Sequence, residues 1–172
     1  MREGIMSNCN DDGLGPFALQ GAILRAWHST AVAVLDSYEG KRDKEFTAHA
    51  TRFDDSDTML FFGYVAQAPG QVIMQSRIVN ALASSRESRQ AKRQDIKRRA
   101  DAVELFGLIE REYLSDVAVQ FSITARGREV LAMYEAAYAV EVRKLRAPFD
   151  LTDSDRRSEL LCDASFRQPV PT

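Results

Sequence analysis

The stretch from Ser84 to Val130 constrains the fold more than any other part of the chain, because charge, hydrophobic spacing and turn-forming residues change along it in one order. Ser84 and Glu87 have the spacing of a capping box, which satisfies free N–H groups in the first turn of a helix. Gly107 suits the left-handed residue that ends a helix. Between these points, apolar residues follow helical spacing at Ile96, Ala100 and Val103. We therefore expect a helix over this segment.

The expected helix is strongly basic. Residues 86–99 carry seven positive and two negative side chains, a local charge of +5 on a chain whose net charge is −2, so the rest of the chain carries −7. Segregated positive charge on an acidic protein favours a surface for a polyanion, because the repulsion within one helix needs a compensating use. A solvated helix face is the alternative explanation, since charge runs often serve solubility only.

Residues 108–123 favour a β-hairpin after the glycine. β-branched and aromatic residues become frequent there, and Ser115-Asp116 can form the turn between two short strands. The second strand alternates strictly, with apolar side chains at Val117, Val119, Phe121 and Ile123. Thr124 can then cap a second helix from Ala125 to Leu145. Its apolar positions recur every three to four residues, at Val130, Tyr134, Ala137 or Tyr138, and Val142.

A basic helix, a glycine stop, a two-stranded hairpin and a following helix form the second half of a winged helix-turn-helix. Residues 107–111 (GLIER) and 123–128 (ITARGR) resemble the "GLIER … LTxxGR" signature of the MarR-like winged-helix regulators, in the right order and at the right separation. The resemblance covers roughly residues 56–145. It implies a mainly α (α+β) fold with a two-stranded hairpin wing, in which long N- and C-terminal helices of two protomers intertwine into a dimer that binds DNA.

Two features depart from the family pattern. The serines at the start of the basic helix lie about seven residues further from the glycine than in the family, which is nearly two helical turns and roughly preserves the helix phase. The hairpin tip, residues 113–117 (YLSDV), carries no basic residue, whereas family members usually have a tip rich in Asp and Arg. We therefore expect no minor-groove arginine at the wing.

The chain before residue 56 divides into three segments. Residues 1–15 combine Gly, Asn and Asp with little hydrophobicity, so we expect a mobile leader without function. Residues 16–40 should form a long amphipathic helix that begins at Pro16 and runs up to Gly40. Residues 41–55 are charged and poorly periodic, which predicts a linker with about one helical turn.

Residues 56–124 are expected to form the DNA-binding domain. Ser56 can cap a helix that Pro69-Gly70 ends abruptly, and residues 75–82 favour the short supporting helix of a helix-turn-helix. Residues 125–146 should form the C-terminal dimerisation helix. Residues 147–172 are expected to be a tail, with a short helix within residues 151–161.

Several classes of function find no support in the sequence. No run approaches the roughly 18 apolar residues of a membrane span, and the N-terminus lacks a basic-then-apolar signal pattern, so we expect a cytoplasmic protein without membrane contact. A phosphate-binding glycine loop, a nucleophile elbow and the HExxH motif are absent. We therefore expect no catalytic residue, no cofactor and no metal.

The remaining reactive residues have structural explanations. Cys9 and Cys162 lie far from a second cysteine or histidine at metal spacing, so free thiols are expected, with redox sensing as the alternative. His28 and His49 have no partner visible in the sequence, and a lone histidine needs a carboxylate, nucleophile or metal nearby to do chemistry. Helix-dipole stabilisation and solubility explain the three aspartates within residues 54–57.

The favoured function is a transcriptional regulator that binds double-stranded DNA sequence-specifically, with the basic helix in the major groove. On a helical wheel, the sector away from the apolar residues contains Arg86, Gln90, Arg93, Gln94 and Lys97. Arg93 and Gln94 are the expected base contacts, because arginine pairs with guanine and glutamine with adenine. We expect phosphate contacts at Arg77, Arg89 and Lys92, and the DNA-binding set also includes Ser85 and Arg98.

A second function remains open on the residues alone. A winged-helix module could serve dimerisation or protein docking, with the basic helix binding an acidic partner protein. The wing tip without basic charge supports this alternative. Direct binding to duplex with steep salt dependence separates the two, because phosphate contacts displace counterions.

We expect a homodimer held by the two long helices. Their apolar stripes are Leu19, Ile23, Trp27 and Val34 on the first helix and Val130, Tyr134, Tyr138 and Val142 on the second. Closed only on each other within one chain, these helices would overhang the domain and expose apolar patches that monomers rarely tolerate. The resemblance also implies a small aromatic or phenolic effector between these helices and the DNA-binding unit. Trp27, Phe61 and Tyr134 could contribute there, although core packing explains their spacing equally well.

Overall fold

A computed structural model describes residues 14–84 and 88–147. These residues form six α-helices and three short β-strands, so the mainly α (α+β) class is confirmed. In chain order the elements are α1 (Pro16–Asp36), α2 (Lys44–Phe53), α3 (Ser56–Gln67), a 3-10 turn (Pro69–Gln71), β1 (Val72–Met74), α4 (Gln75–Leu82), α5 (Arg89–Leu105), β2 (Ile109–Tyr113), β3 (Val119–Ile123) and α6 (Ala125–Arg146). Most of the expected leader, both cysteines, Ser85, Arg86 and the expected tail helix lie outside the described residues.

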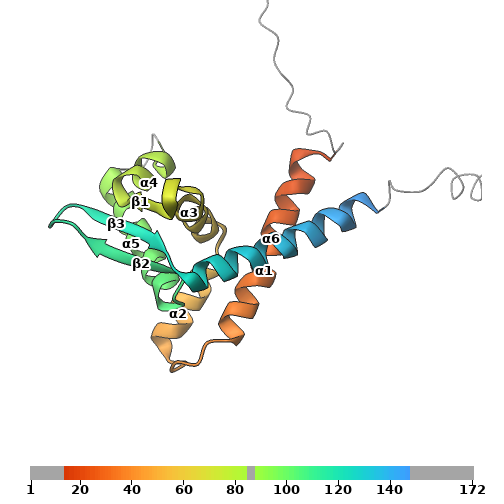
Figure 1. Ribbon diagram of the computed structural model, residues 1–172, viewed down its shortest axis with the longest axis horizontal. Helices are drawn as coiled ribbons and strands as arrows, with labels where there is room; N and C mark the ends of the chain where they lie inside the picture. Colours follow the sequence, from red (N-terminus) through yellow and green to blue (C-terminus); the bar gives the residue numbers. More distant parts are fainter. Residues whose placement is uncertain (1–13, 85–87, 148–172) are drawn as a thin grey trace, which may run out of the picture.

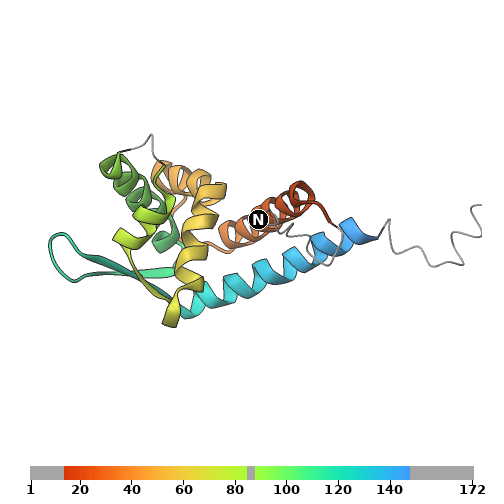
Figure 2. The ribbon, with the colours of Figure 1, turned by 90° about the horizontal axis from the view of Figure 1, so that it is seen from above.

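The molecule has a body and an extension. The body consists of α2 to α5 and the sheet, and the β2–β3 hairpin projects from it at one end (Figure 1). At the other end α1 and α6 cross each other and reach beyond the body (Figures 1 and 2). These two helices pack on each other more extensively than any other pair of elements. The chain therefore closes its two long helices on each other within one protomer.

The sheet has three antiparallel strands in the order β1-β3-β2. The expected hairpin pairs Ile109 with Ile123 and Tyr113 with Val119, which confirms its two strands. The third strand was not expected: β1 runs along the other side of β3 and pairs Ile73 with Phe121. A strand of three residues is too short for alternation to identify it in the sequence.

The hydrophobic core lies between α3, α5, the sheet and part of α1. Phe61 of α3 meets Phe121 of β3 edge to face, with ring centroids 5.2 Å apart. Trp27 of α1 donates its indole N–H to the carbonyl oxygen of Phe53 at 3.1 Å. The expected apolar positions of α5 are all fully buried: Ile96, Ala100 and Val103. The helical spacing in the sequence therefore identified the packed face of α5 correctly.

The two signature motifs meet at one point of the fold. Gly107 has a φ of 78°, and the N–H groups of Gly107 and Leu108 donate to carbonyl oxygens of the last turn of α5 at 2.9 and 3.1 Å, the pattern of a Schellman motif. Thr124 donates its backbone N–H to the Leu108 carbonyl oxygen at 3.0 Å and caps α6 by accepting from the N–H of Gly127. A Cβ atom at Gly127 would overlap that same carbonyl oxygen, so the contact requires glycine.

The expected linker is wrong, because residues 44–53 form α2. Its N-cap Asp43 accepts from the N–H groups of Glu45 and Phe46. Phe46 and Phe53 pack against Phe106 at the end of α5, with ring centroids 6.1 and 4.9 Å away. The sequence did carry a signal for this helix, because Phe46 and Phe53 lie seven residues apart and so share one face, while most other positions are polar or charged.

Two helix starts also differ from the expectation. The N-cap of α5 is Ser88, which accepts from the N–H of Ala91 at 3.1 Å, so the expected cap at Ser84 is wrong. The helix therefore begins closer to Gly107 than the sequence indicated. In the same way Asp55, not Ser56, caps α3. Neighbouring serines and aspartates all cap well, so propensity alone could not choose between them.

The expected dimer residues fall into two groups. Trp27, Val34 and Val130 are at most 2% exposed and belong to the core of a single chain, so a second subunit cannot reach them. The other five are half-buried: Leu19, Ile23, Tyr134, Tyr138 and Val142. The assignment of Trp27, Val34 and Val130 to an interface between chains is therefore corrected. Other apolar side chains on the same two helices are exposed, namely Phe17, Leu24 and Val32 on α1 and Met133 and Val140 on α6.

Candidate nucleic-acid interface

The N-terminal half of α5 presents polar and basic side chains to solvent. The helix is anchored by its buried C-terminal half and by the Ser88 cap, so its first turns are ordered without being covered. The exposed members of the expected DNA-binding set on this helix are Arg89, Gln90, Arg93, Gln94, Lys97 and Arg98. Arg77, on the solvent side of α4, is exposed as well. Ser85 and Arg86 lie outside the described residues.

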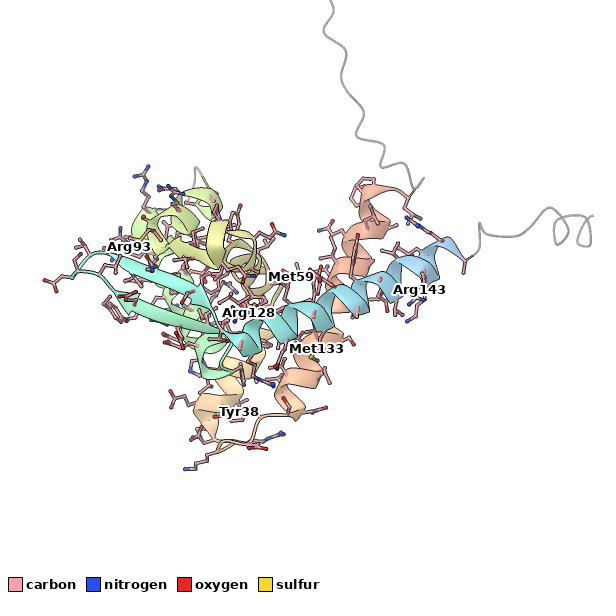
Figure 3. All side chains as sticks on the ribbon, viewed as in Figure 1. Tyr38, Met59, Arg93, Arg128, Met133 and Arg143 are labelled. Carbon is pink, nitrogen blue, oxygen red and sulfur yellow. The ribbon has the colours of Figure 1, made fainter. Side chains whose placement is uncertain are left out.

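A cleft of about 350 Å³ lies between α5, the start of α4 and the hairpin. Its α5 wall is formed by Gln90, Arg93, Gln94 and Lys97. These are the four described residues of the sector expected to contact bases, so the fold places this sector on one side of the helix. Figure 3 shows Arg93 on the side of α5 that faces the hairpin. Arg77, Arg89 and Arg98 are exposed but do not line the cleft.

Lys92 lies on a different side of α5 from this cleft. Its ammonium group is 3.5 Å from a carboxylate oxygen of Asp95, and only 13% of its side chain is exposed. It lines a small hollow between α3 and α5, together with Asp57 and Arg99. The expected phosphate contact at Lys92 is therefore corrected: the residue belongs to the α3–α5 contact.

Arg99 shares the buried face of α5, three residues after Ile96 and four before Val103, and the expected DNA-binding set did not include it. Its guanidinium group is buried, and it contacts carboxylate oxygens of Asp95 at 3.0 Å, Asp55 at 2.9 Å and Asp57 at 3.4 Å. Burial raises the pKa of the Asp55 carboxyl, but hydrogen bonds and the charge of Arg99 outweigh it and hold that pKa below its ordinary value. Arg99 and Lys92 therefore contribute to packing, and the basic surface of α5 is smaller than the charge count suggested.

Asp55 and Asp57 gain a specific role from this arrangement. The sequence explained them by helix-dipole stabilisation and solubility, and Asp55 does cap α3. Both carboxylates also fix α5 against the start of α3 through Arg99. Thr58 completes the contact by accepting from Arg99 at 3.0 Å. The orientation of the basic helix thus depends on charged groups that lie more than 40 residues away in the chain.

The hairpin forms the second wall of the cleft. Arg111, its only basic residue, has a side chain that is 7% exposed and contacts carboxylate oxygens of Asp101 at 2.7 Å and Glu104 at 3.1 Å. The tip is apolar and exposed, with Tyr113 at 65% and Val117 at 85%. Arg111 and Tyr113 were missed as candidate site residues. Strand alternation could have found them, because it places both on one face of β2.

An apolar crevice of about 320 Å³ lies between α1, α3 and α6. Trp27, Phe62, Leu131 and Tyr134 are among its lining residues. Two of the three aromatic residues expected at an effector site, Trp27 and Tyr134, therefore meet there, with ring centroids 6.3 Å apart. Phe61, the third, is fully buried in the core and does not line the crevice.

The two histidines have carboxylate neighbours that the sequence did not reveal. Nδ1 of His28 lies 2.8 Å from an oxygen of Asp54, which links α1 to the end of α2. His49 lies 3.7 Å from Glu45 within α2. In the part of the chain that the structure describes, no group of three His, Cys, Asp or Glu residues could hold a metal ion.

Comparison of the chain with models of protein families, with curated proteins and with solved structures found no match in any of the three. Among the described helices, none combines the length and the apolar character needed to cross a membrane.

Proposed function

We propose that this chain is a transcriptional regulator that binds double-stranded DNA sequence-specifically through α5. One observation carries the proposal: α5 buries one face completely and presents Arg93, Gln94 and Lys97 on the other, beside a projecting hairpin. A helix anchored in this way fits the major groove, which admits a single α-helix. The cytoplasm, where such a regulator would meet DNA, is the proposed location.

The order of elements supports a winged helix-turn-helix. In this proposal α4 and α5 are the supporting and recognition helices, β2 and β3 form the wing, and β1 closes the sheet on the other side. The MarR-like family remains the proposed relationship, and the contact between Leu108 and Gly127 supports it, because it gives both signature motifs one structural purpose. The absence of a basic residue at the hairpin tip is the main departure from that family.

The exposed residues of α5 divide by chemistry. Arg93 can pair bidentately with guanine, and Gln90 or Gln94 with adenine, so these residues are proposed to contact base edges. Arg77, Arg89 and Arg98 are exposed outside the cleft and are proposed to contact phosphates on either side of the groove. Lys97, which lines the cleft further along α5, carries a point charge that suits a phosphate oxygen.

A titration of duplex DNA at two salt concentrations tests this function. With about six to ten phosphates contacted by a dimer, the affinity should fall by about a thousandfold or more between about 50 and 200 mM salt, because each contact releases counterions. Fluorescence anisotropy of labelled genomic-fragment duplexes measures both the affinity and its slope. A chain with no affinity for any duplex at low salt would contradict the proposal.

The alternative proposal is a protein-interaction module whose basic helix docks an acidic partner protein. The exposed apolar tip at Tyr113, Leu114 and Val117 favours it, since such side chains often contact protein. The same titration separates the two functions. A protein-docking module has no general affinity for duplex, whereas the DNA-binding protein binds every duplex weakly and its operator tightly.

The regulator is proposed to act as a homodimer. The outward faces of α1 and α6 carry Phe17, Leu24, Val32, Met133 and Val140, and both helices extend beyond the body (Figure 1). A second copy would cover these faces and set two recognition helices about one turn of DNA apart. The proposed operator is therefore close to a palindrome.

A small aromatic effector is proposed for the crevice between α1, α3 and α6. The crevice joins the helices of the extension to a helix of the body, so a ligand there could shift one relative to the other. Binding should quench the fluorescence of Trp27, the only tryptophan, and release duplex from the same sample. A compound that quenches Trp27 without releasing DNA would contradict a regulatory role for the crevice.

A further inference from the structure

The two walls of the cleft differ in chemistry. Arg93 and Lys97 supply positive charge from α5, while the hairpin supplies the hydroxyl group of Tyr113. Nη1 of Arg111 donates to that hydroxyl oxygen at 3.5 Å, and Arg111 is itself held by Asp101 and Glu104. Because a phenol has one proton and accepts from Arg111 through its oxygen, the Tyr113 proton is available to a further acceptor. The hairpin therefore offers a donor, although its only arginine is already paired.

We propose that this cleft grips one backbone phosphate of the bound duplex, with Lys97 on one side and the Tyr113 hydroxyl on the other, while Arg93 beside them contacts a base edge. The inference rests on the proposed DNA-binding function and deepens it. In this arrangement the hairpin binds DNA through Tyr113, because its basic residue, Arg111, is already paired with Asp101 and Glu104.

The chemistry of the walls favours a phosphate over a base edge. A phosphate oxygen accepts hydrogen bonds from cations and from neutral hydroxyl groups alike, and tyrosine is among the side chains that contact DNA phosphates. Two of the cleft's glutamines, Gln90 and Gln94, lie on α5, where base edges are expected, a third, Gln75, lies at the start of α4, and none is on the hairpin wall. Asp116, at the rim of the cleft, is the one residue there whose charge opposes a phosphate.

The first test compares a neutral and a charged contact. Tyr113→Phe should weaken binding of the full chain to duplex by about tenfold, because it removes a hydrogen bond to a charged oxygen. The slope of affinity against salt should stay unchanged, since a hydroxyl displaces no counterion. Lys97→Gln should lower that slope by about 0.9 for each phosphate that the lysine no longer neutralises. Asp116→Asn should strengthen binding, because it removes the repulsion at the rim.

The second test locates the phosphate on the DNA. Duplexes are prepared with one neutral methylphosphonate at successive positions and titrated with the parent and with Tyr113→Phe. At one position in each half-site both proteins should lose the charge contact with Lys97, and the parent should lose a further factor of about ten, because the variant's hydroxyl is already absent. Tyr113 is exposed, so the variant should keep the thermal stability of the parent. Leu114→Ala, an uncharged change at the same exposed tip, is the matched control and should leave the affinity unchanged.

Two outcomes would overturn the inference without touching the proposed function. One is a parent that binds duplex with the expected salt slope while Tyr113→Phe binds equally well. The other is tight binding of inorganic pyrophosphate to the parent, measured by calorimetry, together with a Tyr113→Phe variant that loses this binding but keeps its affinity for duplex. That result would assign the cleft to a free phosphorylated ligand. If the parent binds no duplex at all, the DNA-binding function itself fails.

Discussion

Replacing Arg93 and Lys97 together with glutamate is expected to abolish duplex binding while the fold stays intact. Both side chains are exposed on the cleft side of α5, so packing does not depend on them. Removing each side chain's interaction with DNA should cost about 1–3 kcal/mol, and two new carboxylates add repulsion from the phosphates, so the affinity should fall by about a thousandfold or more. Anisotropy titrations at low salt measure the affinity, and circular dichroism checks the fold.

The matched control changes the same charges elsewhere. Lys41, between α1 and α2, and Arg143, near the end of α6, are exposed, and neither lines the cleft. Figure 3 shows Arg143 at the far end of α6. Lys41→Glu with Arg143→Glu gives the same net charge, so long-range repulsion from DNA is similar in both double variants. The control should lose little affinity. The groove assignment is wrong if the control weakens binding as much as the cleft variant, or if the cleft variant binds like the parent.

Those parts of the fold that depend on local chemistry could be predicted from the sequence. The packed face of α5, the glycine stop, the hairpin and the Thr124 cap each follow from spacing or turn preference within about 15 residues. Of the elements that were missed, only β1 has a weak local signal, because it is too short to alternate. α2 had a readable one, since Asp43 caps it and Phe46 and Phe53 share the face that packs against Phe106 at the end of α5.

Within the candidate site, the sequence also leaves the partners of single basic residues unknown. Lys97, Arg98 and Arg99 are consecutive basic residues, yet Arg99 is buried and the other two are exposed. Helical phase gave the right sector for Arg93 and Lys97, and it also places Arg99 beside Ile96 on the packed face. The carboxylate partners of Arg99 could not be predicted, because Asp55 and Asp57 lie at the start of α3, more than 40 residues earlier in the chain.

Three of the residues expected at a dimer interface, Trp27, Val34 and Val130, are buried within one chain. The strongest apolar stripe on an amphipathic helix marks the face buried first, and in this chain α1 and α6 bury those stripes on the core and on each other. A second copy has to use what remains exposed. Removal of α1 would therefore take Trp27, Ala31 and Val34 out of the core, and a truncated chain would test folding instead of association.

Substituting Leu24 and Met133 both with glutamate is expected to convert a dimer into a monomer. These side chains are 41% and 42% exposed on α1 and α6, so each change is tolerated within one chain. In a symmetric dimer each substitution occurs twice, and burying the introduced charges without partners should raise the dissociation constant by about a thousandfold or more. Sedimentation velocity at micromolar concentration measures the change.

The Arg93 and Lys97 double glutamate variant is the control for this experiment, because it should remain dimeric while losing DNA. The two variants should therefore fail in different ways. The monomeric variant keeps an intact cleft, so its affinity for a single half-site should depend on salt as steeply, per protomer, as that of the parent. It should lose the large gain in affinity that a palindromic site gives to two linked recognition helices. A parent that sediments as a monomer at micromolar concentration, or a Leu24 and Met133 variant that stays dimeric, would remove these faces from the interface. The exposed apolar side chains would then need a different partner.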